Sequence, residues 1–192
     1  MITFKTFNNY LSLITSLFNT VEEESLYKLF ERILESFENS STIFIAGNGG
    51  SASIASHAST DLNKLEKNGK YLNVVSLSTN IPNLMAIGND NGFENIFTEQ
   101  MKNFCLTKND FLITISSSGN SQNIINLIKL FNAKDLDSYS LSGFSGGEVV
   151  KVAKNNIFIE SPDNYYGPVE DLHMMIFHYF AHMIKQDIKE IY

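Results

Sequence analysis

Apolar residues near the start of the chain recur every three or four positions, which is the spacing of one face of a helix. A first amphipathic helix is predicted from five of them: Phe4, Phe7, Leu11, Ile14 and Phe18. A second helix is expected over residues 21–37, where three glutamates in the first turn complement the helix dipole. We expect this N-terminal pair, residues 1–40, to cover a sheet face or, the interpretation we favour, to present its aromatic stripes to another subunit.

Short apolar runs alternate with helical patterns over the rest of the chain, residues 41–192. Strands are predicted at residues 42–46, 72–77, 111–115, 137–141 and 156–160. Helices are predicted at residues 50–65, 82–87, 94–103, 121–132, 147–153 and 168–188. This alternation is typical of the α/β class, and we expect a single domain, residues 1–192, built on a doubly wound, five-stranded parallel sheet.

Two predicted strands run directly into loops of glycine, serine and asparagine that open a helix. Residues 47–51 read Gly-Asn-Gly-Gly-Ser, and residues 116–121 read Ser-Ser-Ser-Gly-Asn-Ser. Such a junction presents unpaired backbone N–H groups and the positive end of a helix dipole to an anion. Both loops follow the carboxyl ends of strands, where doubly wound sheets bind ligands, so the pair predicts a ligand that carries a phosphate.

A nucleotide cofactor does not fit the first loop. Gly47 and Gly49 match the loose dinucleotide pattern, but the second predicted strand ends without the carboxylate that would hold a ribose. No Gly-Lys-Ser/Thr follows the glycines, as a Walker A loop requires. We therefore expect a phosphorylated small molecule and no nucleotide cofactor.

The charge of the chain limits the classes of molecule that it is expected to bind. The formal net charge is −7 and Arg32 is the only arginine, which disfavours nucleic acid and leaves phosphate binding to backbone amides and serines. Cys105 is the only cysteine, so an intrachain disulfide is excluded, and no apolar run is long enough to cross a bilayer. We expect a cytoplasmic protein that binds neither nucleic acid nor membrane.

Two predicted helices carry residues suited to acid–base chemistry. His57 and Asp61 lie four residues apart and share a helix face, although such a pair on its own is more often a surface ion pair. The last helix holds three of the four histidines: His173, His178 and His182. We interpret His173 and His182 as core or interface residues and assign a functional role to His178.

Together these motifs resemble the sugar isomerase (SIS) domain family, and within it the phosphoheptose isomerases. The resemblance rests on the two loops, on His57 and Asp61, on residues 86–93 (Ala-Ile-Gly-Asn-Asp-Asn-Gly-Phe), and on residues 170–173 (Glu-Asp-Leu-His) with His178 after them. It implies a flavodoxin-like fold and a homotetramer with shared active sites. It also implies conversion of sedoheptulose 7-phosphate to a heptose 7-phosphate, which supplies ADP-heptose, lipopolysaccharide or capsule synthesis.

By position, the resemblance assigns roles to particular residues. Asp61 and His178 would be the acid–base pair that moves a proton between adjacent carbons through an enediolate. Some family members bind zinc, and its ligands here would be His57, Asp61, Glu170 and His178. The substrate would be bound by Asn48, Gly49, Ser51, Asp90, Ser116, Ser117, Ser118, Ser121 and Glu170.

Five positions depart from the family pattern. Asp61 replaces the usual Glu, Glu170 replaces a Gln, and Leu65 replaces an Arg. Gly167 and Pro168 stand where the family has an Asp and an Arg. We expect the phosphate grip and the acid–base pair to be kept and the sugar-hydroxyl contacts to differ, which makes a related phosphosugar an alternative substrate.

A protein of this fold without turnover is the competing interpretation. It would be a tetrameric partner-binding protein of the DnaA-associating type, or a phosphosugar sensor. An adaptor has no need of four groups that can bind a metal or move a proton, so their presence favours the isomerase.

Overall fold

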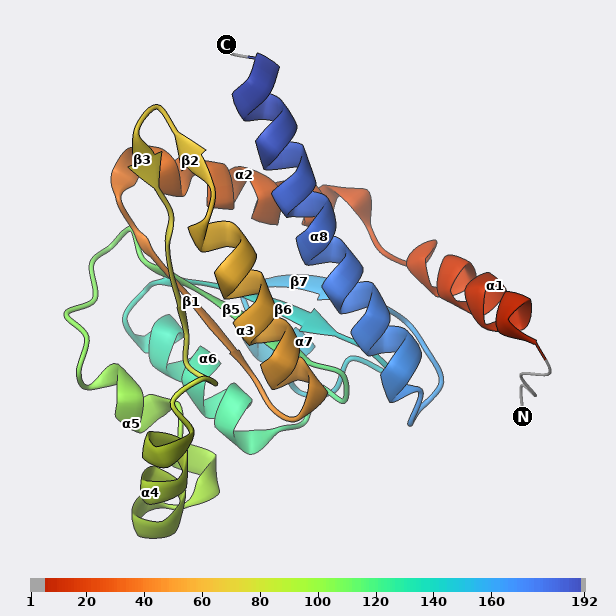
Figure 1. Ribbon diagram of the computed structural model, residues 1–192. Coiled ribbons are helices and arrows are strands. Elements are labelled where there is room, and N and C mark those ends of the chain that lie inside the picture. Colours follow the sequence, from red (N-terminus) through yellow and green to blue (C-terminus); the bar gives the residue numbers. More distant parts are fainter. Residues whose placement is uncertain (1–5, 191–192) are drawn as a thin grey trace.

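The centre of the molecule is a parallel sheet whose strands are buried on both faces. The computed structural model describes residues 6–190 and the side chains of residues 6–186 (Figure 1). The strands lie in the order β4-β1-β5-β6-β7 and every neighbouring pair is parallel. Their bounds are β1 Thr42–Gly47, β4 Asn73–Ser76, β5 Phe111–Ser116, β6 Asp137–Ser142 and β7 Asn155–Phe158. The predicted fold class is therefore confirmed.

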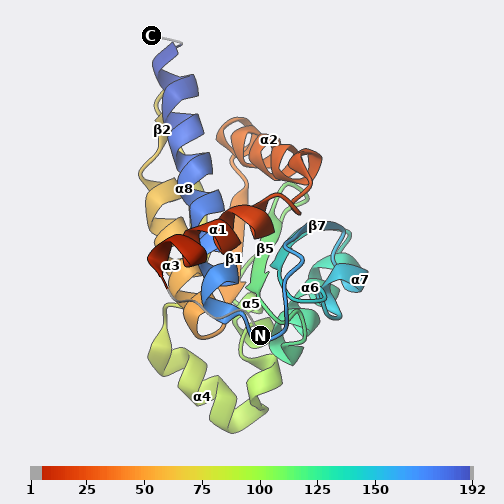
Figure 2. The same ribbon diagram turned by 90° about the vertical axis from the view of Figure 1, so that its right-hand side faces the viewer.

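Helices cover both faces of this sheet, as Figure 2 shows from the side. Alternate residues of β1 face opposite layers: Ile43 and Ile45 pack into one core, and Phe44 and Ala46 pack into the other. The first core is closed by α1 (Phe7–Phe18), α2 (Glu23–Asn39), α3 (Gly50–Asn63) and α8 (Tyr166–Glu190). The second is closed by α5 (Thr98–Met101), α6 (Gln122–Ala133), α7 (Val149–Val152) and the residues Ile96 and Phe97 that follow the short helix η1 (Phe93–Asn95).

The strand order fixes where a ligand can enter. Chain order reverses between β1 and β5, which lie side by side with Gly47 paired to Ile115 at their carboxyl ends. The loops after these two strands diverge to opposite faces of the sheet, into α3 and α6. This is the topological switch point, where open α/β sheets bind their ligands.

One segment lies outside the predicted pattern, and one predicted helix is longer than expected. A hairpin, β2 (Glu66–Lys67) with β3 (Lys70–Tyr71), turns through Asn68 and Gly69, both at positive φ, which is the Asn-Gly turn typical of two-residue hairpins. The helix α4 (Ile81–Asn91) buries none of its residues and projects beyond the carboxyl edge of the sheet (Figure 1).

The helix predicted over residues 94–103 is wrong as one element, because the chain breaks between η1 and α5. The Gln100 side chain donates to the carbonyls of Leu77 and Ile96, at 3.1 and 2.8 Å. A side chain that occupies the carbonyl four residues back competes with the helix ladder. Among the described residues, no helix is long and apolar enough to span a membrane.

Candidate active site

The two predicted loops meet in one pocket at the switch point. Its volume is about 320 Å³. It is lined by Asn48, Gly49, Gly50, Ser51, Ile115, Ser116, Ser117, Ser118, Ser121, Tyr166 and Glu170. All the predicted substrate-binding residues except Asp90 therefore line one cavity.

Both loops end at helix N-termini that are not capped by the side chain of the N-cap residue, although in α6 the Ile124 N–H donates to Asn123 Oδ1 at 2.9 Å. The N-cap positions of α3 and α6 are Gly49 and Ser121, and neither accepts a capping hydrogen bond through a side chain. The loops are tied together by Asn48 and Asn123, whose amide groups exchange two hydrogen bonds of 2.8 and 3.0 Å. A rigid pair of such helix N-termini is suited to hold a dianionic phosphate.

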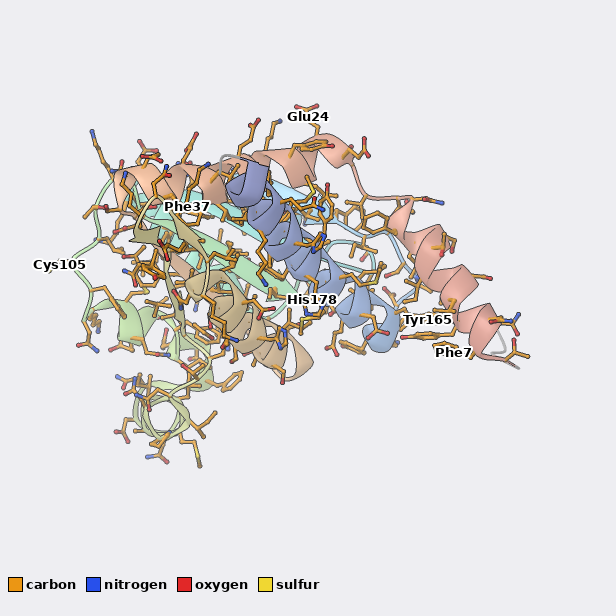
Figure 3. The ribbon with its side chains drawn as sticks, turned by 45° about the horizontal axis from the view of Figure 1, so that its top comes forward. Phe7, Glu24, Phe37, Cys105, Tyr165 and His178 are labelled. Carbon is orange, nitrogen blue, oxygen red and sulfur yellow. The ribbon has the colours of Figure 1, made fainter. Side chains whose placement is uncertain are left out.

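Three residues from distant parts of the chain form a second group beside this pocket. His57 and Asp61 lie on α3, and His178, labelled in Figure 3, lies on the neighbouring helix α8. The Nε2 atoms of the two histidines lie 3.0 Å apart, and Asp61 Oδ2 lies 3.2 Å from His57 Nε2 and 4.0 Å from His178 Nε2. Two imidazole nitrogens at this separation need a proton or a cation between them, because two facing lone pairs repel.

The geometry of this group fits a divalent metal. In a tetrahedral zinc site with bonds of about 2.0–2.1 Å, ligand atoms lie roughly 3.3 Å apart. Two of the three separations, 3.0 and 3.2 Å, are close to this value, and the third, between Asp61 and His178, is longer at 4.0 Å. Both imidazoles are about half exposed, so a fourth position is open to solvent or substrate. Two histidines and a carboxylate are the donor set of several catalytic zinc sites.

Glu170 lies outside this group. Its carboxylate covers Gly50 at the start of α3, where any side chain would collide with it. Burial, followed by the charge of Asp171, raises the pKa of Glu170. The role of Glu170 as a fourth metal ligand remains a prediction, and within this chain Glu170 lines the pocket that the two loops form, the predicted phosphate pocket.

Asp90 is also placed elsewhere. It lies near the end of α4, is exposed to solvent, and accepts a 2.8 Å hydrogen bond from its neighbour Asn89. It does not line the pocket of this chain. A contact between Asp90 and substrate remains a prediction.

The remaining charged candidates are structural. His173 is fully buried and neither ring nitrogen forms a well-directed hydrogen bond with a described residue, as expected of a core histidine. Burial lowers its pKa to about 4, and the Ser142 backbone offsets only part of that effect. Arg32 lies at the opposite end of the sheet, over the Phe111 ring at 4.4 Å and 3.6 Å from Asp137.

Two residues of the site were not predicted. Asn123 is buried on α6 and bonds Asn48 across the two loops. Tyr166, the first residue of α8, lines the pocket beside Glu170. The signal for Tyr166 was its place four residues before Glu170, which puts both on one helix face.

Comparison with known families agrees with this geometry. The family described as the SIS domain matches residues 6–143. A phosphoheptose isomerase of Helicobacter pylori is 36% identical and covers 85% of this chain and 84% of its own length. That of Helicobacter hepaticus is 32% identical and covers 96% and 92%. The chain belongs to the SIS domain family.

Solved structures narrow the class further. The phosphoheptose isomerase GmhA from Neisseria gonorrhoeae has a TM-score of 0.82 at 28% identity, and the match covers 94% of this chain and 95% of that one. A phosphoheptose isomerase from Francisella tularensis shares the fold, with a TM-score of 0.81, 22% identity and 94% of each chain covered. Within the SIS domain family this chain is a phosphosugar isomerase of the aldose–ketose class.

Proposed function

We infer that this enzyme interconverts sedoheptulose 7-phosphate and a heptose 7-phosphate. The observation that carries this proposal is that the phosphate pocket and the His57–Asp61–His178 group lie along the same two helices. Gly50 meets Glu170 at one level of α3 and α8, and His57 meets His178 two turns further along both. The two sites therefore face one substrate from its two ends.

The distance along the helices between the Gly50–Glu170 contact and the His57–His178 contact favours a seven-carbon sugar phosphate. Seven residues separate Gly50 from His57, which corresponds to about 10 Å along a helix. An extended seven-carbon sugar phosphate spans a comparable length from its phosphate to its carbonyl end. With the phosphate against Ser51 and the serine loop, carbons 1 and 2 reach the histidine–aspartate group.

The proposed chemistry is proton transfer between these carbons. The Asp61 carboxylate takes a proton from carbon 1 of the ketose, which leaves an enediolate across carbons 1 and 2. His178 moves a proton from oxygen 1 to oxygen 2, and Asp61 returns its proton to carbon 2 to give the aldose. His178 suits this shuttle because an imidazole has one nitrogen that can accept a proton and one that can donate a proton.

A zinc ion is the cofactor we propose, held by His57, Asp61 and His178. When bound, such an ion polarises the carbonyl and stabilises the negative charge of the enediolate. A carboxylate oxygen that binds the metal is a weaker base. Asp61 can therefore bind zinc and also accept the substrate proton only if one of its two carboxylate oxygens stays free of the metal.

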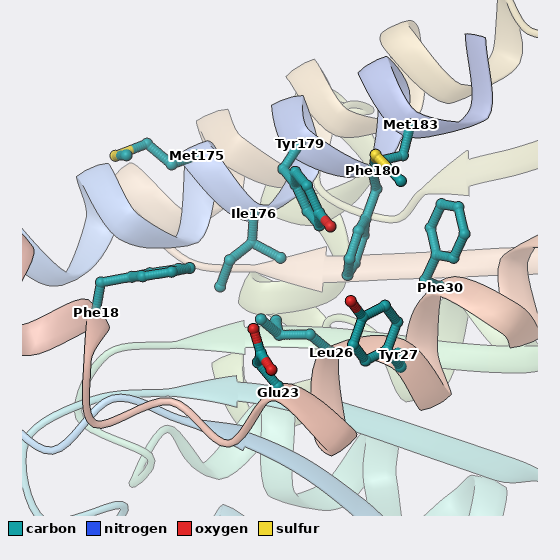
Figure 4. Close-up of a pocket in the computed structure, with 10 residues that line it drawn as sticks. All are labelled: Phe18, Glu23, Leu26, Tyr27, Phe30, Met175, Ile176, Tyr179, Phe180 and Met183. Atoms are coloured by element: carbon teal, nitrogen blue, oxygen red, sulfur yellow. The ribbon is translucent and has the colours of Figure 1, made fainter. Parts of the chain in front are cut away.

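The assembly we propose is a homotetramer. An apolar groove of about 370 Å³ separates α2 from α8, and Figure 4 shows aromatic and aliphatic side chains from both helices lining it. Phe18, Tyr27, Met175 and Tyr179 are each at least 40% exposed there, and Phe7 and Leu11 continue the exposed surface on α1. A second copy of this chain is the occupant that the family resemblance indicates, and α4 with Asp90 would then reach a neighbouring active site.

The proposal is tested by incubating the purified enzyme with sedoheptulose 7-phosphate and detecting the aldose by NMR. Formation of heptose 7-phosphate supports the isomerase. Tight binding without turnover would instead support the phosphosugar sensor, and absence of both would exclude this substrate.

A further inference from the structure

The wall of the phosphate pocket that comes from α8 has an unusual composition. The other walls are amide and hydroxyl groups of the two loops, with Ile115 at the back. From α8 only Tyr166 and Glu170 line the pocket, and the residues after Tyr166 are a glycine and a proline, without polar side chains. Tyr166 is the only aromatic residue among the described residues that line this cavity.

The Tyr166 ring is held by a rigid support. It packs edge-on against Phe144, with ring centroids 4.9 Å apart and planes at 82°. Phe144 is buried and has a positive φ of 54°. Its backbone N–H donates to Ser161 Oγ at 2.9 Å, and its carbonyl accepts from the Ser161 N–H at 3.1 Å. Residues held in such a conformation by their surroundings cluster at ligand sites.

Different walls of the pocket suit different parts of a sugar phosphate. The phosphate is matched by backbone amides and serines. Tyr166 lies one turn before Glu170 on α8, on the side away from His178, so its ring borders the phosphate end of the ligand, where the last carbons of the chain join the phosphate. An aromatic ring offers an apolar face to sugar C–H groups, and the phenol adds one donor for a sugar hydroxyl. Tyr166 is 47% exposed and lines the pocket, so part of its side chain is accessible to a ligand.

We propose that Tyr166 is a specificity-determining residue that contacts the carbon chain of the phosphosugar while the serine loop holds the phosphate. This proposal rests on the proposed function and adds a residue that distinguishes a sugar phosphate from phosphate alone. The preorganised ring costs little conformational entropy when the sugar binds. The contact depends on the sugar and is absent when inorganic phosphate binds alone.

The test compares the affinities of two ligands by calorimetry: sedoheptulose 7-phosphate and inorganic phosphate. For Tyr166→Ala we expect affinity for the sugar phosphate to fall about tenfold or more, and for Tyr166→Phe about threefold, the effect of one hydrogen bond. Affinity for inorganic phosphate should stay within about twofold of the wild type in both variants. Tyr71→Phe, an exposed tyrosine on β3, is the matched control and should change neither affinity.

Equal losses for both ligands would overturn the proposal, because Tyr166 would then only support the pocket. Unchanged sugar-phosphate affinity in Tyr166→Ala would also overturn it, as would a wild-type enzyme that binds the sugar phosphate no better than phosphate. A wild-type enzyme that binds the sugar phosphate but does not isomerise it refutes the proposed function and leaves this binding test valid.

Discussion

At the scale of single residues, the accessible groups of the site contrast with a histidine buried in the core beside them. His57, Asp61 and His178 stay accessible at the surface, where protons and ligands exchange with solvent. His173, on the same helix as His178, is sealed in the core. Two histidines five residues apart therefore lie in opposite environments, and each gives a separate prediction.

The first prediction concerns acid stability. The pKa of His173 is about 4 in the folded protein and near 6.5 in the unfolded chain, so the unfolded chain binds its proton first as pH falls. The stability contributed by the neutral ring is complete above pH 6.5 and is lost between pH 6.5 and 4. We expect this group to remove about 2 kcal/mol from the free energy of unfolding between pH 7.5 and 5.

Urea unfolding at these two pH values measures the effect. His173→Gln should show a pH dependence that is smaller by about that amount, whatever its absolute stability. His182→Gln, which replaces an exposed histidine of the same helix, is the control and should match the wild type. An unchanged pH dependence in His173→Gln would show that burial does not suppress protonation.

The second prediction concerns the metal. Protein purified without a histidine tag and supplied with zinc should retain one ion per chain after dialysis, measured by elemental analysis. His57→Ala and His178→Ala should each lose most of it, because two protein ligands rarely hold zinc. His182→Ala should keep it. If the wild-type protein takes up no zinc, the metal proposal is wrong, and Asp61 and His178 would act as a metal-free acid–base pair.

At the scale of elements, two strand–loop–helix units create the phosphate pocket. Each places unpaired amides at the carboxyl edge of the sheet, and the Asn48–Asn123 pair fixes one against the other. With no arginine at this edge, hydroxyls and amides must supply the binding energy. Removing hydroxyls from both units should therefore weaken phosphate binding directly.

The third prediction is that Ser51→Ala combined with Ser121→Ala raises KM for the sugar phosphate at least tenfold. Hydrogen bonds to charged groups contribute about 1.5–3 kcal/mol each, so loss of two is enough for this effect. Steady-state kinetics measures it, with Ser145→Ala, an exposed serine outside the pocket, as control. An unchanged KM in the double variant would remove these serines from the phosphate site.

The elements themselves were largely predictable because their signals are local. The buried central strands β1 and β5 leave continuous apolar runs, and all five strands were found to within one or two residues. The hairpin at residues 66–71 was missed although its Asn68-Gly69 turn was visible. The break between η1 and α5 was not visible, because it depends on Gln100 bonding Leu77, 23 residues away.

Only part of the site was predictable from the sequence, because only part of it is formed by residues that are close together along the chain. Each loop is a contiguous motif, but the contact of His57 with His178 joins residues 121 positions apart, and no spacing rule predicts it. Family resemblance supplied that pair. The placement of Glu170 over Gly50 depends on how α3 and α8 pack, which only the structure reveals.

At the scale of the whole molecule, exposed apolar surface indicates an assembly. The groove between α2 and α8 and the projecting α4 leave Met85, Phe93, Met175 and Tyr179 accessible to solvent. Monomeric proteins rarely expose large contiguous apolar patches without a partner. The fourth prediction is a tetramer in sedimentation at micromolar concentration.

Charges placed in the groove should break this assembly. Met175→Glu with Tyr179→Glu is expected to give smaller species, while Glu23→Gln, at the groove's polar edge, should leave the tetramer intact. A wild-type chain that sediments as a monomer would contradict the tetramer and every site shared between subunits.

The central claim, an isomerase that moves a proton through an enediolate, is tested most directly in heavy water. The enzyme is incubated with sedoheptulose 7-phosphate in D2O and the products are followed by proton NMR. We predict heptose 7-phosphate that carries deuterium at carbon 2, because the proton held by the partly exposed Asp61 exchanges with solvent, and no product from Asp61→Asn. Substrate that stays unchanged with the wild-type enzyme, or product formed equally fast by Asp61→Asn, would contradict the account.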